Sequence, residues 1–187
     1  NDAPIVVFPL DDLTMLEDSG DTTMVLSSMF SDIDGDELLY SVVVIPEGIV
    51  TTDIDSSNLI ISTLPDQFGE DILITVTADD QSGASISDNF ILTVEGINDP
   101  PVLQEIDNQI INEDGYLIYS IYANDIDGDY LTYFVADSGG MATSISGNIL
   151  TVTPPEDYNG STNLIISITD NEYTVSEDFT LTVNAVN

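Results

Sequence analysis

Residues 72–80 read Ile-Leu-Ile-Thr-Val-Thr-Ala-Asp-Asp, and their alternation is the clearest indication of secondary structure in the chain. Every second residue from Ile72 to Ala78 is apolar, while the residues between them turn polar from Thr75 onward. Since alternate side chains of an extended chain face opposite sides of a sheet, the pattern predicts a half-buried β-strand. Asp80 continues the inward-facing parity, so a carboxylate ends the strand in line with the core residues.

Runs rich in Val, Ile, Thr and Tyr surround this stretch and are bounded by Asp, Gly, Asn, Ser and Pro. They are residues 22–26, 38–44, 59–62 and 86–94 and, further along, 116–121, 130–135, 149–153, 164–168 and 174–183. Short strands at close spacing, without a helical segment between them, are typical of an antiparallel β-sandwich.

The whole pattern occurs twice. Asn1-Asp2-Ala3-Pro4 recurs as Asn98-Asp99-Pro100-Pro101, Glu17-Asp18 as Glu113-Asp114, and Asp32-Ile33-Asp34-Gly35-Asp36 as Asp125-Ile126-Asp127-Gly128-Asp129. The order is kept while the spacing drifts by loop-sized amounts. We therefore expect an all-β chain of two tandem repeats, residues 1–97 and 98–187, with a linker at about 96–101. Each repeat should be an antiparallel sandwich of about seven strands, and we interpret the sequence as an excerpt of a longer chain.

The charge composition excludes several classes of partner. The chain has 35 Asp and Glu residues but no Lys, Arg or His, which gives a net charge of −35. Such a chain should repel nucleic acid and anionic membranes, because nothing in it can offset a phosphate. With neither His nor Cys, it also lacks the usual ligands of zinc, copper and iron. The natural counter-ion is a hard cation bound through oxygen, either calcium or magnesium.

The same composition argues against an enzyme and against a membrane protein. A Ser or Thr nucleophile would have no His or Lys to activate it, so only carboxylate chemistry is left. We expect no catalytic residues. No apolar run approaches the roughly 20 residues of a membrane span, so we also expect no membrane insertion.

Two carboxylate patterns predict where a cation would bind. In an extended segment residues i and i+2 face the same side, so Asp125 and Asp127 can converge on one ion while Gly128 lets the chain turn. Asp170 ends a strand in register with core residues, as Asp80 does in the first repeat. A single Asp-x-Asp-Gly would be interpreted as a plain turn. Its duplication beside the other motifs favours metal binding.

The order of these motifs resembles the cadherin repeat, and especially the bacterial and dystroglycan-type cadherin-like modules. It consists of an Asn-Asp-x-Pro linker, a Glu, an Asp-x-Asp-Gly, an acid after a Pro, and an Asp at a strand end. In that family calcium lies at the junction between successive domains. The resemblance implies a central calcium site formed by Glu17, Asp66, Asn98, Asp99, Asp125, Asp127 and Asp170.

The linker departs from the animal cadherin pattern at two positions, where Gly96 and Pro100 stand in place of an Asp and an Asn. We therefore expect about two calcium ions at the central junction rather than three. Incomplete half-sites are expected at the two ends of the chain, formed by Asn1, Asp2, Asp32, Asp34 and Asp80 and by Glu113, Glu156 and Asn187.

Two functions agree with these features. The first is a calcium-rigidified extracellular spacer in a large surface or secreted adhesin, on a bacterial cell surface, with neighbouring repeats as its partners. The second is a calcium-dependent binding module for a glycan or for another domain of the same kind. No feature of the sequence locates such a binding surface.

Overall fold

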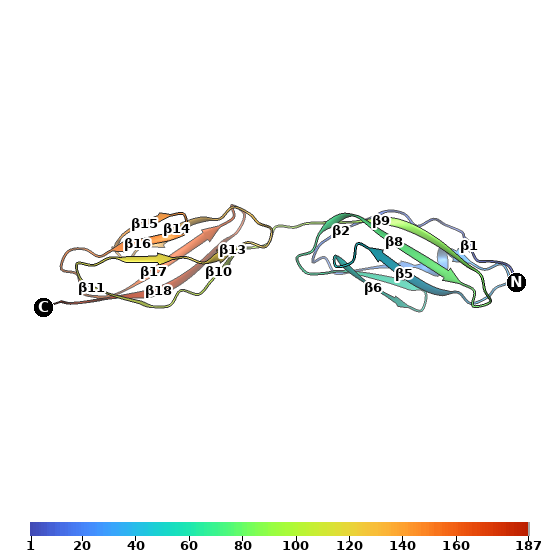
Figure 1. Ribbon diagram of the computed structural model, residues 1–187, viewed down its shortest axis with the longest axis horizontal. Coiled ribbons are helices and arrows are strands. Elements are labelled where there is room, and N and C mark those ends of the chain that lie inside the picture. The colour runs from blue at the N-terminus through green and yellow to red at the C-terminus, as the bar shows by residue number, and fades with distance from the viewer. Residues whose placement is uncertain (187) are drawn as a thin grey trace. The chain divides into compact units, whose positions relative to one another are not determined.

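The computed structural model describes residues 1–186, with the side chain of Asp137 left aside. The chain divides into two compact units, Asn1–Ile97 and Asn98–Asn187. Both are built almost wholly of β-strands, and the resemblance between the two sequence repeats extends to their topology (Figure 1).

The first unit consists of two packed sheets and a short strand pair. The larger sheet has the order β2 (Leu13–Leu16), β9 (Ser85–Glu95), β8 (Gly69–Asp79) and β5 (Leu39–Ile45). The smaller sheet has the order β3 (Asp21–Val25), β7 (Asn58–Thr63) and β6 (Val50–Asp55). The short pair joins β1 (Ile5–Val6) to β4 (Phe30–Ser31), and a single 3₁₀ turn, η1 (Leu26–Ser28), precedes β4.

The second unit repeats this arrangement. Its larger sheet has the order β11 (Gln109–Asn112), β18 (Thr174–Asn184), β17 (Gly160–Thr169) and β14 (Thr132–Asp137). The smaller sheet has the order β12 (Leu117–Ser120), β16 (Ile149–Thr153) and β15 (Ala142–Ser146), and the short pair joins β10 (Val102–Leu103) to β13 (Ala123–Asn124). The expected two-sheet sandwich is confirmed, with seven strands of four or more residues in the described part of each unit.

One pair in each unit runs parallel, which the sequence pattern did not predict. β2 pairs in parallel with β9, and β11 pairs in parallel with β18. These strands are only four residues long, and each takes the edge of the larger sheet that the hairpin strands leave open. They cap an edge that would otherwise present unpaired backbone groups.

The core of each unit lies between its two sheets. In the first unit the inward residues of this alternating stretch, from Ile72 to Ala78, are fully buried, and they pack with Leu59 and Ile61 of the opposite sheet. The second unit forms an equivalent cluster around Ile166 and Leu150. The period-two interpretation of residues 72–80 is therefore confirmed.

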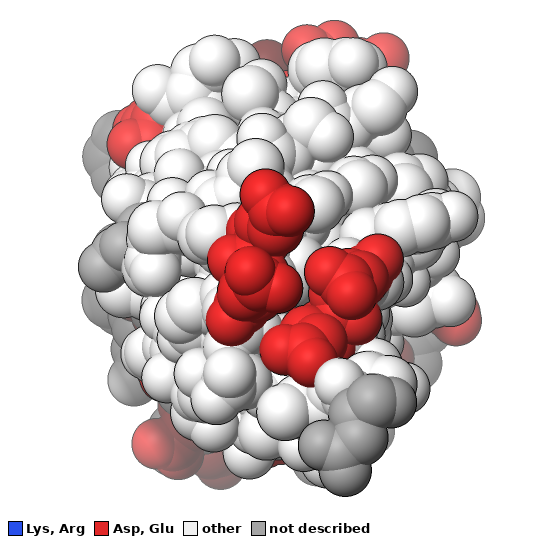
Figure 2. Space-filling view, turned by 90° about the vertical axis from the view of Figure 1, so that its left-hand side faces the viewer, with Lys and Arg blue, Asp and Glu red and all other residues white. Residues whose placement is uncertain are grey.

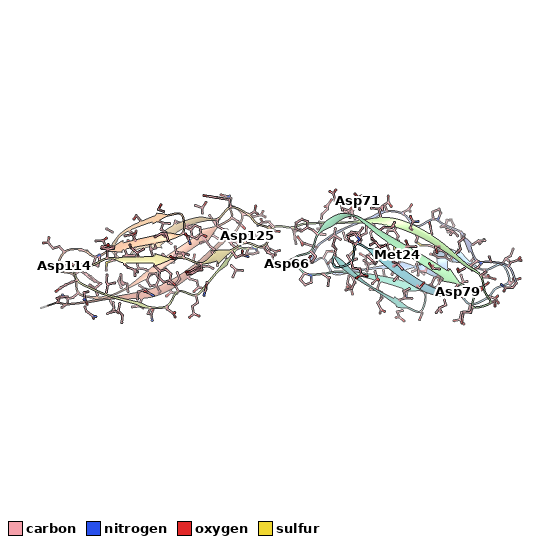
Figure 3. All side chains as sticks on the ribbon, in the orientation of Figure 1. Met24, Asp66, Asp71, Asp79, Asp114 and Asp125 are labelled. Carbon is pink, nitrogen blue, oxygen red and sulfur yellow. The ribbon has the colours of Figure 1, made fainter. Side chains whose placement is uncertain are left out.

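Strand directions carry acidic residues to both ends of each sandwich. In Figure 3 the first unit carries Asp79 at one end and Asp66 and Asp71 at the other, and the second unit carries Asp125 and Asp114 at its opposite ends. In the described part of the chain no helix is long and apolar enough to cross a membrane.

The alternation predicts a contrast between two leucines of the first unit. Leu59 is fully buried and Leu39 is 61% exposed. We expect Leu59→Ala to lower the free energy of unfolding by about 2 to 5 kcal/mol, because it leaves a cavity in the core. The matched change Leu39→Ala should cost less than about 0.5 kcal/mol. Urea denaturation followed by circular dichroism measures both, and equal losses would contradict the described core.

Candidate metal centre

The Asp-x-Asp-Gly-Asp loop of the second unit wraps its backbone around one carboxylate. Asp125 Oδ1 accepts hydrogen bonds from the amides of Asp127, at 3.1 Å, and Asp129, at 3.2 Å. Gly128 has a φ of +80°, a backbone conformation that side chains with a Cβ rarely adopt, so it permits this tight turn. The loop brings one oxygen each of Asp125, Asp127 and Asp129 within 4.8 Å of one another.

The second oxygen of Asp125 distinguishes this loop from a plain turn. The residue is only 9% exposed, and in the part of the chain that the structure describes no donor reaches its buried Oδ2. The turn alone accounts for Oδ1 but leaves a buried, charged oxygen without a partner. Such an oxygen is costly unless water or a cation contacts it, and the chain has no cationic side chain to do so.

The first unit builds the same loop. Asp32 Oδ1 accepts from the amides of Asp34, at 2.8 Å, and Asp36, at 3.4 Å, and its Oδ2 is buried without a hydrogen-bond partner among the described residues. One oxygen each of these three carboxylates lies within 4.8 Å of the others. The arrangement therefore belongs to the repeat and arises twice from the same five-residue motif.

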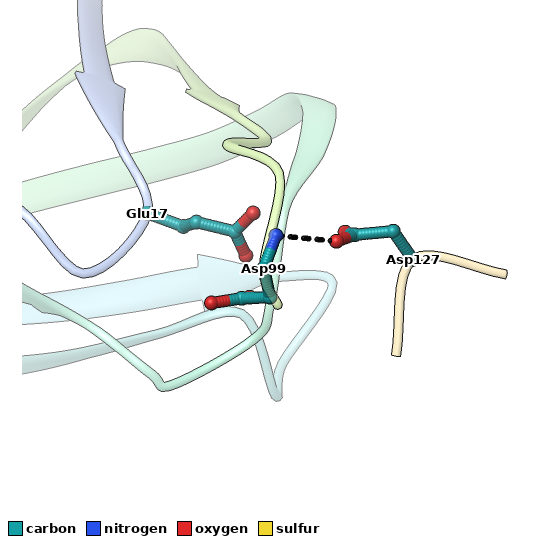
Figure 4. Close-up of side chains that lie close together, drawn as sticks. All are labelled: Glu17, Asp99 and Asp127. Carbon is teal, nitrogen blue, oxygen red and sulfur yellow. Dashed lines mark hydrogen bonds between the residues drawn. The ribbon is translucent and has the colours of Figure 1, made fainter. Parts of the chain in front are cut away.

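The first residues of each unit donate hydrogen bonds to this loop. In the second unit the amide of Asp99 donates to Asp127 Oδ2 at 2.8 Å (Figure 4). In the first unit the amide of Asp2 donates to Asp34 Oδ2 at 2.6 Å. Each opening Asp thus lies beside the Asp-x-Asp pair of its own unit.

The opening asparagines hold the strand-end aspartates. Asn98 Nδ2 donates to Asp170 Oδ2 at 2.9 Å, and the amides of Glu172 and Tyr173 donate to Asp170 Oδ1 at 2.7 and 2.6 Å. Burial raises the pKa of Asp170, but these hydrogen bonds, led by that of Asn98, outweigh it and hold the pKa below its usual value. Asp170 is thereby kept ionised, as a cation ligand must be.

Asp80 has the same surroundings in the first unit. Asn1 Nδ2 donates to its Oδ2 at 2.8 Å, and the amides of Ser82 and Ala84 donate to its Oδ1 at 2.8 and 2.9 Å. The hydrogen bond from Asn1 is the main reason that the pKa of Asp80 is lowered, and the backbone amides add to it.

The opposite end of each unit carries the predicted glutamates. Glu17, 1% exposed, accepts the Ile97 amide on Oε1 at 2.8 Å, and its buried Oε2 has no hydrogen-bond partner among the described residues. Glu113 accepts the Val186 amide in the same way at 2.6 Å. Both glutamates therefore hold the segment by which the last strand leaves its unit.

The remaining predicted ligands are more exposed. Asp66 lies at the glutamate end of the first unit, where one of its oxygens comes within 4.8 Å of an oxygen of Asp18. Glu156 is exposed in the second unit, and Asn187 lies outside the described residues. Figure 2 faces the C-terminal end of the second unit and shows its acidic side chains gathered into groups on an otherwise uncharged surface.

Sequence reasoning missed three carboxylates that belong to these clusters, Asp18, Asp36 and Asp129. The signal was present, since Asp36 and Asp129 end the repeated five-residue motif and Asp18 follows Glu17. The i and i+2 argument covers only the first two acids of the motif, so it omits Asp36 and Asp129, and the resemblance to cadherin repeats assigns only the Glu at position 17, so it omits Asp18.

The donor set suits a hard cation. At separations of about 5 Å and an effective dielectric constant of about 20, each pair of carboxylates repels by about 3 kcal/mol. Several carboxylate oxygens gathered in irregular loops form an all-oxygen ligand set of the kind that calcium accepts.

Comparison with known proteins places these sandwiches in a family. A family model described as bacterial Ig domain matches residues 1–93 and 98–184. The chain belongs to this family, in two tandem copies. Among curated proteins, none matches the chain.

Solved structures resemble the paired bacterial Ig domains. Human protocadherin-24 EC1-2 is 16% identical, with a TM-score of 0.56 and all of both chains covered. Protocadherin gammaB7 EC3-6 is 18% identical, with a TM-score of 0.52, 99% of this chain and 48% of that chain covered. The resemblance to cadherin repeats thus holds for the fold. The chain also aligns with an endo-fucoidan hydrolase of glycoside hydrolase family 107 at 16% identity and a TM-score of 0.46, covering 99% of this chain but only 29% of that one.

The contacts of Asn98 and Asn1 predict how the pKa values of Asp170 and Asp80 respond to mutation. We expect Asn98→Ala to raise the pKa of Asp170, because the leading hydrogen bond to its charged form is lost. Asn1→Ala should raise the pKa of Asp80 and leave that of Asp170 unchanged. Carboxyl-carbon NMR titration in chelator measures both, and an unmoved Asp170 in Asn98→Ala would contradict the described contact.

The sign of the effect on stability follows from the lowered pKa. The contribution of Asp170 to the free energy of unfolding is complete above the unfolded-state pKa of about 3.9 and is lost as the pH falls through the lower folded-state pKa. In chelator, Asn98→Ala should therefore shift this loss to a higher pH than in the parent chain.

Proposed function

We propose that these tandem bacterial Ig domains bind calcium and serve as a calcium-rigidified extracellular spacer. The observation that carries the proposal is the buried second oxygen of Asp32 and of Asp125, for which the described residues provide no hydrogen-bond partner at the same point of both repeats. A chain with a net charge of −35 and no cationic side chain can complete such oxygens only with water or an external cation. Water does not neutralise the charge of a carboxylate cluster.

Calcium fits this donor set better than magnesium. Calcium takes six to eight oxygens in irregular geometry, whereas magnesium requires a near-ideal octahedron and gives up its waters reluctantly. The candidate ligands come from loops, a strand end and a linker, which favours the more tolerant ion. The affinity for calcium need only suit the calcium concentration outside a cell. When that concentration is about ten times the dissociation constant, binding raises the free energy of unfolding by about 1.4 kcal/mol.

We propose further that the linker shares calcium between the two domains. Two within-unit contacts support this: Glu17 accepts the amide of Ile97, and Asn98 donates to Asp170. Ile97 and Asn98 are consecutive in the chain, so their Cα atoms are separated by about 3.8 Å. A cation bound by the acids beside both residues would restrain the linker, which the repulsion between these acids would otherwise leave loose.

The remaining parts of the proposal follow from the same composition. An external, calcium-rich setting on a bacterial surface or in a secreted adhesin suits the acidic repeats, and neighbouring repeats would be the first partners. We propose no catalytic role, because no His, Cys or Lys is present to act beside the carboxylates. A binding role for a glycan or a like domain is the alternative, and one feature of the second domain favours the glycan, as argued below.

Calcium binding is tested by comparing the same mutation at equivalent aspartates of the two domains. When the 187 residues are produced by themselves, calcium should raise the melting temperature, and Asp125→Asn should remove most of this gain. The repeat-equivalent Asp32→Asn should remove clearly less of it, because in this chain a Glu-bearing domain precedes only the second domain, which leaves the Asp32 site with fewer ligands. Calorimetric titration of chelated protein with calcium gives the affinity and the number of ions, for which we expect about two.

Equal losses in Asp32→Asn and Asp125→Asn would show that each domain binds calcium by itself, and sharing through the linker would be abandoned. Equal stabilisation of the parent chain by magnesium and calcium would reduce the effect to charge screening.

Linker restraint has its own measurement. Small-angle scattering should give a narrower distribution of interatomic distances in calcium than in chelator, because bound ions restrain residues 96–101. Glu17→Gln should bring the calcium curve toward the chelator curve, whereas the same change at the exposed Glu37 should leave it unaltered. Identical curves for the parent chain in the two conditions would contradict the spacer function.

A further inference from the structure

The two domains differ at one position that their topology makes equivalent. Val6 of β1 pairs with Phe30 of β4, and Leu103 of β10 pairs with Ala123 of β13. Val6 and Leu103 are each the second residue after the last proline of the opening motif. Phe30 and Ala123 therefore occupy the same place in their domains.

In the first domain this place is filled by an aromatic ring. Phe30 is 2% exposed, and the centre of its ring lies 5.9 Å from that of Tyr40. Tyr40 pairs with Ala78 across β5 and β8, and Tyr133 pairs with Ile168 across β14 and β17, so Tyr133 is the counterpart of Tyr40. In the second domain position 123 carries only a methyl group instead of a ring.

An open cavity of about 680 Å³ lies at this point of the second domain. Its volume falls within the range of about 300 to 1,000 Å³ that is usual for small-molecule sites. Ala123 and Tyr133 both line it, together with Tyr130, which is 85% exposed and stands where the first domain has Glu37. The second domain thus gains a space and an exposed ring at the same site.

The walls of the cavity combine two kinds of surface. Tyr130 and Tyr133 offer aromatic rings, and short polar side chains that can both donate and accept hydrogen bonds lie beside them. These are Asn124, Thr132 and Asn148. The exposed carboxylate of Asp129 adds acceptors. No cationic side chain exists in the chain, so an anionic ligand would be repelled.

We propose that this cavity binds a neutral saccharide of one or two sugar units. A sugar ring has an apolar face of C–H groups that packs on tyrosine, and a rim of hydroxyls that pair with amides, hydroxyls and carboxylates. A purely apolar ligand would leave the polar wall unpaired, which is unfavourable. The inference goes beyond the spacer function and does not rest on calcium, because the two tyrosines and the neutral side chains of Asn124 and Asn148 line the cavity whether or not calcium is bound.

The test is an NMR titration of the whole ¹⁵N-labelled chain with maltotriose, cellotriose, xylotriose and mannotriose, each in calcium and in chelator. At least one sugar at millimolar concentration should shift the amide signals of Ala123, Thr132 and Asn148. Tyr130→Ala should weaken binding by about fivefold or more, because one stacking surface is lost. Tyr116→Ala is the matched control, since this tyrosine is also exposed but does not line the cavity.

A second variant fills the cavity with the residue that the first domain carries. Ala123→Phe should abolish the sugar-induced shifts while the remaining spectrum keeps the dispersion of a folded chain. The proposal is overturned if none of the four sugars shifts the cavity signals, or if Ala123→Phe and Tyr130→Ala bind sugar like the parent chain. Butylamine, a small organic cation, tests whether the acidic wall binds a cation instead. The proposal is also overturned if butylamine shifts these signals and the sugars do not. Failure of calcium to stabilise the chain would leave a positive sugar titration standing.

Discussion

The constraint on which this structure depends is the absence of any cationic side chain. Each of the 35 acidic residues must be satisfied by a backbone amide, a neutral side chain, water or an ion from outside. Where the chain can, it uses amides: Asp80 and Asp170 each accept two, and an asparagine completes each set. At Asp32 and Asp125 these internal donors reach only one of the two oxygens. Among the described residues, the buried carboxylate oxygens without an internal donor are thus defined atoms, and Oε2 of Glu17 is another of them.

The β-sandwich determines where those atoms lie. A strand that buries alternate residues delivers the next residue of the same parity at its end, which is how Ala78 leads to Asp80 and Ile168 to Asp170. The opening Asn-Asp segment and the Asp-x-Asp loop meet at that same end, whereas the glutamate holds the departing segment at the other. The two ends of each domain therefore differ: the end where the chain begins carries the Asn-Asp segment and the Asp-x-Asp loop, and the end where it leaves carries the glutamate.

The sequence was sufficient to predict features that depend on local period or on a repeated motif. The alternation of residues 72–80 predicted buried and exposed faces, and the duplicated Asp-x-Asp-Gly predicted the acidic loops. β2 and β11 were missed because four residues carry little periodic signal, and their parallel pairing is set by the edge that the other strands leave free. The cavity was missed because it depends on Ala123 lying beside Tyr133, and no local pattern shows which strands become neighbours.

The two domains have matching carboxylate ends but differ at the side where Ala123 replaces Phe30, and this difference indicates how one domain could acquire a separate binding role. Their terminal hydrogen bonds correspond one to one, because each acid there depends on a particular donor. At the side the constraint is only volume: losing a buried Phe ring costs about 3 to 5 kcal/mol when nothing replaces it. The second domain has Ile168, fully buried, where the first has the smaller Ala78, and this residue pairs directly with Tyr133. Added bulk on one side of the tyrosine offsets lost bulk on the other, so the sandwich can open a cavity at position 123 without changing the carboxylate ends.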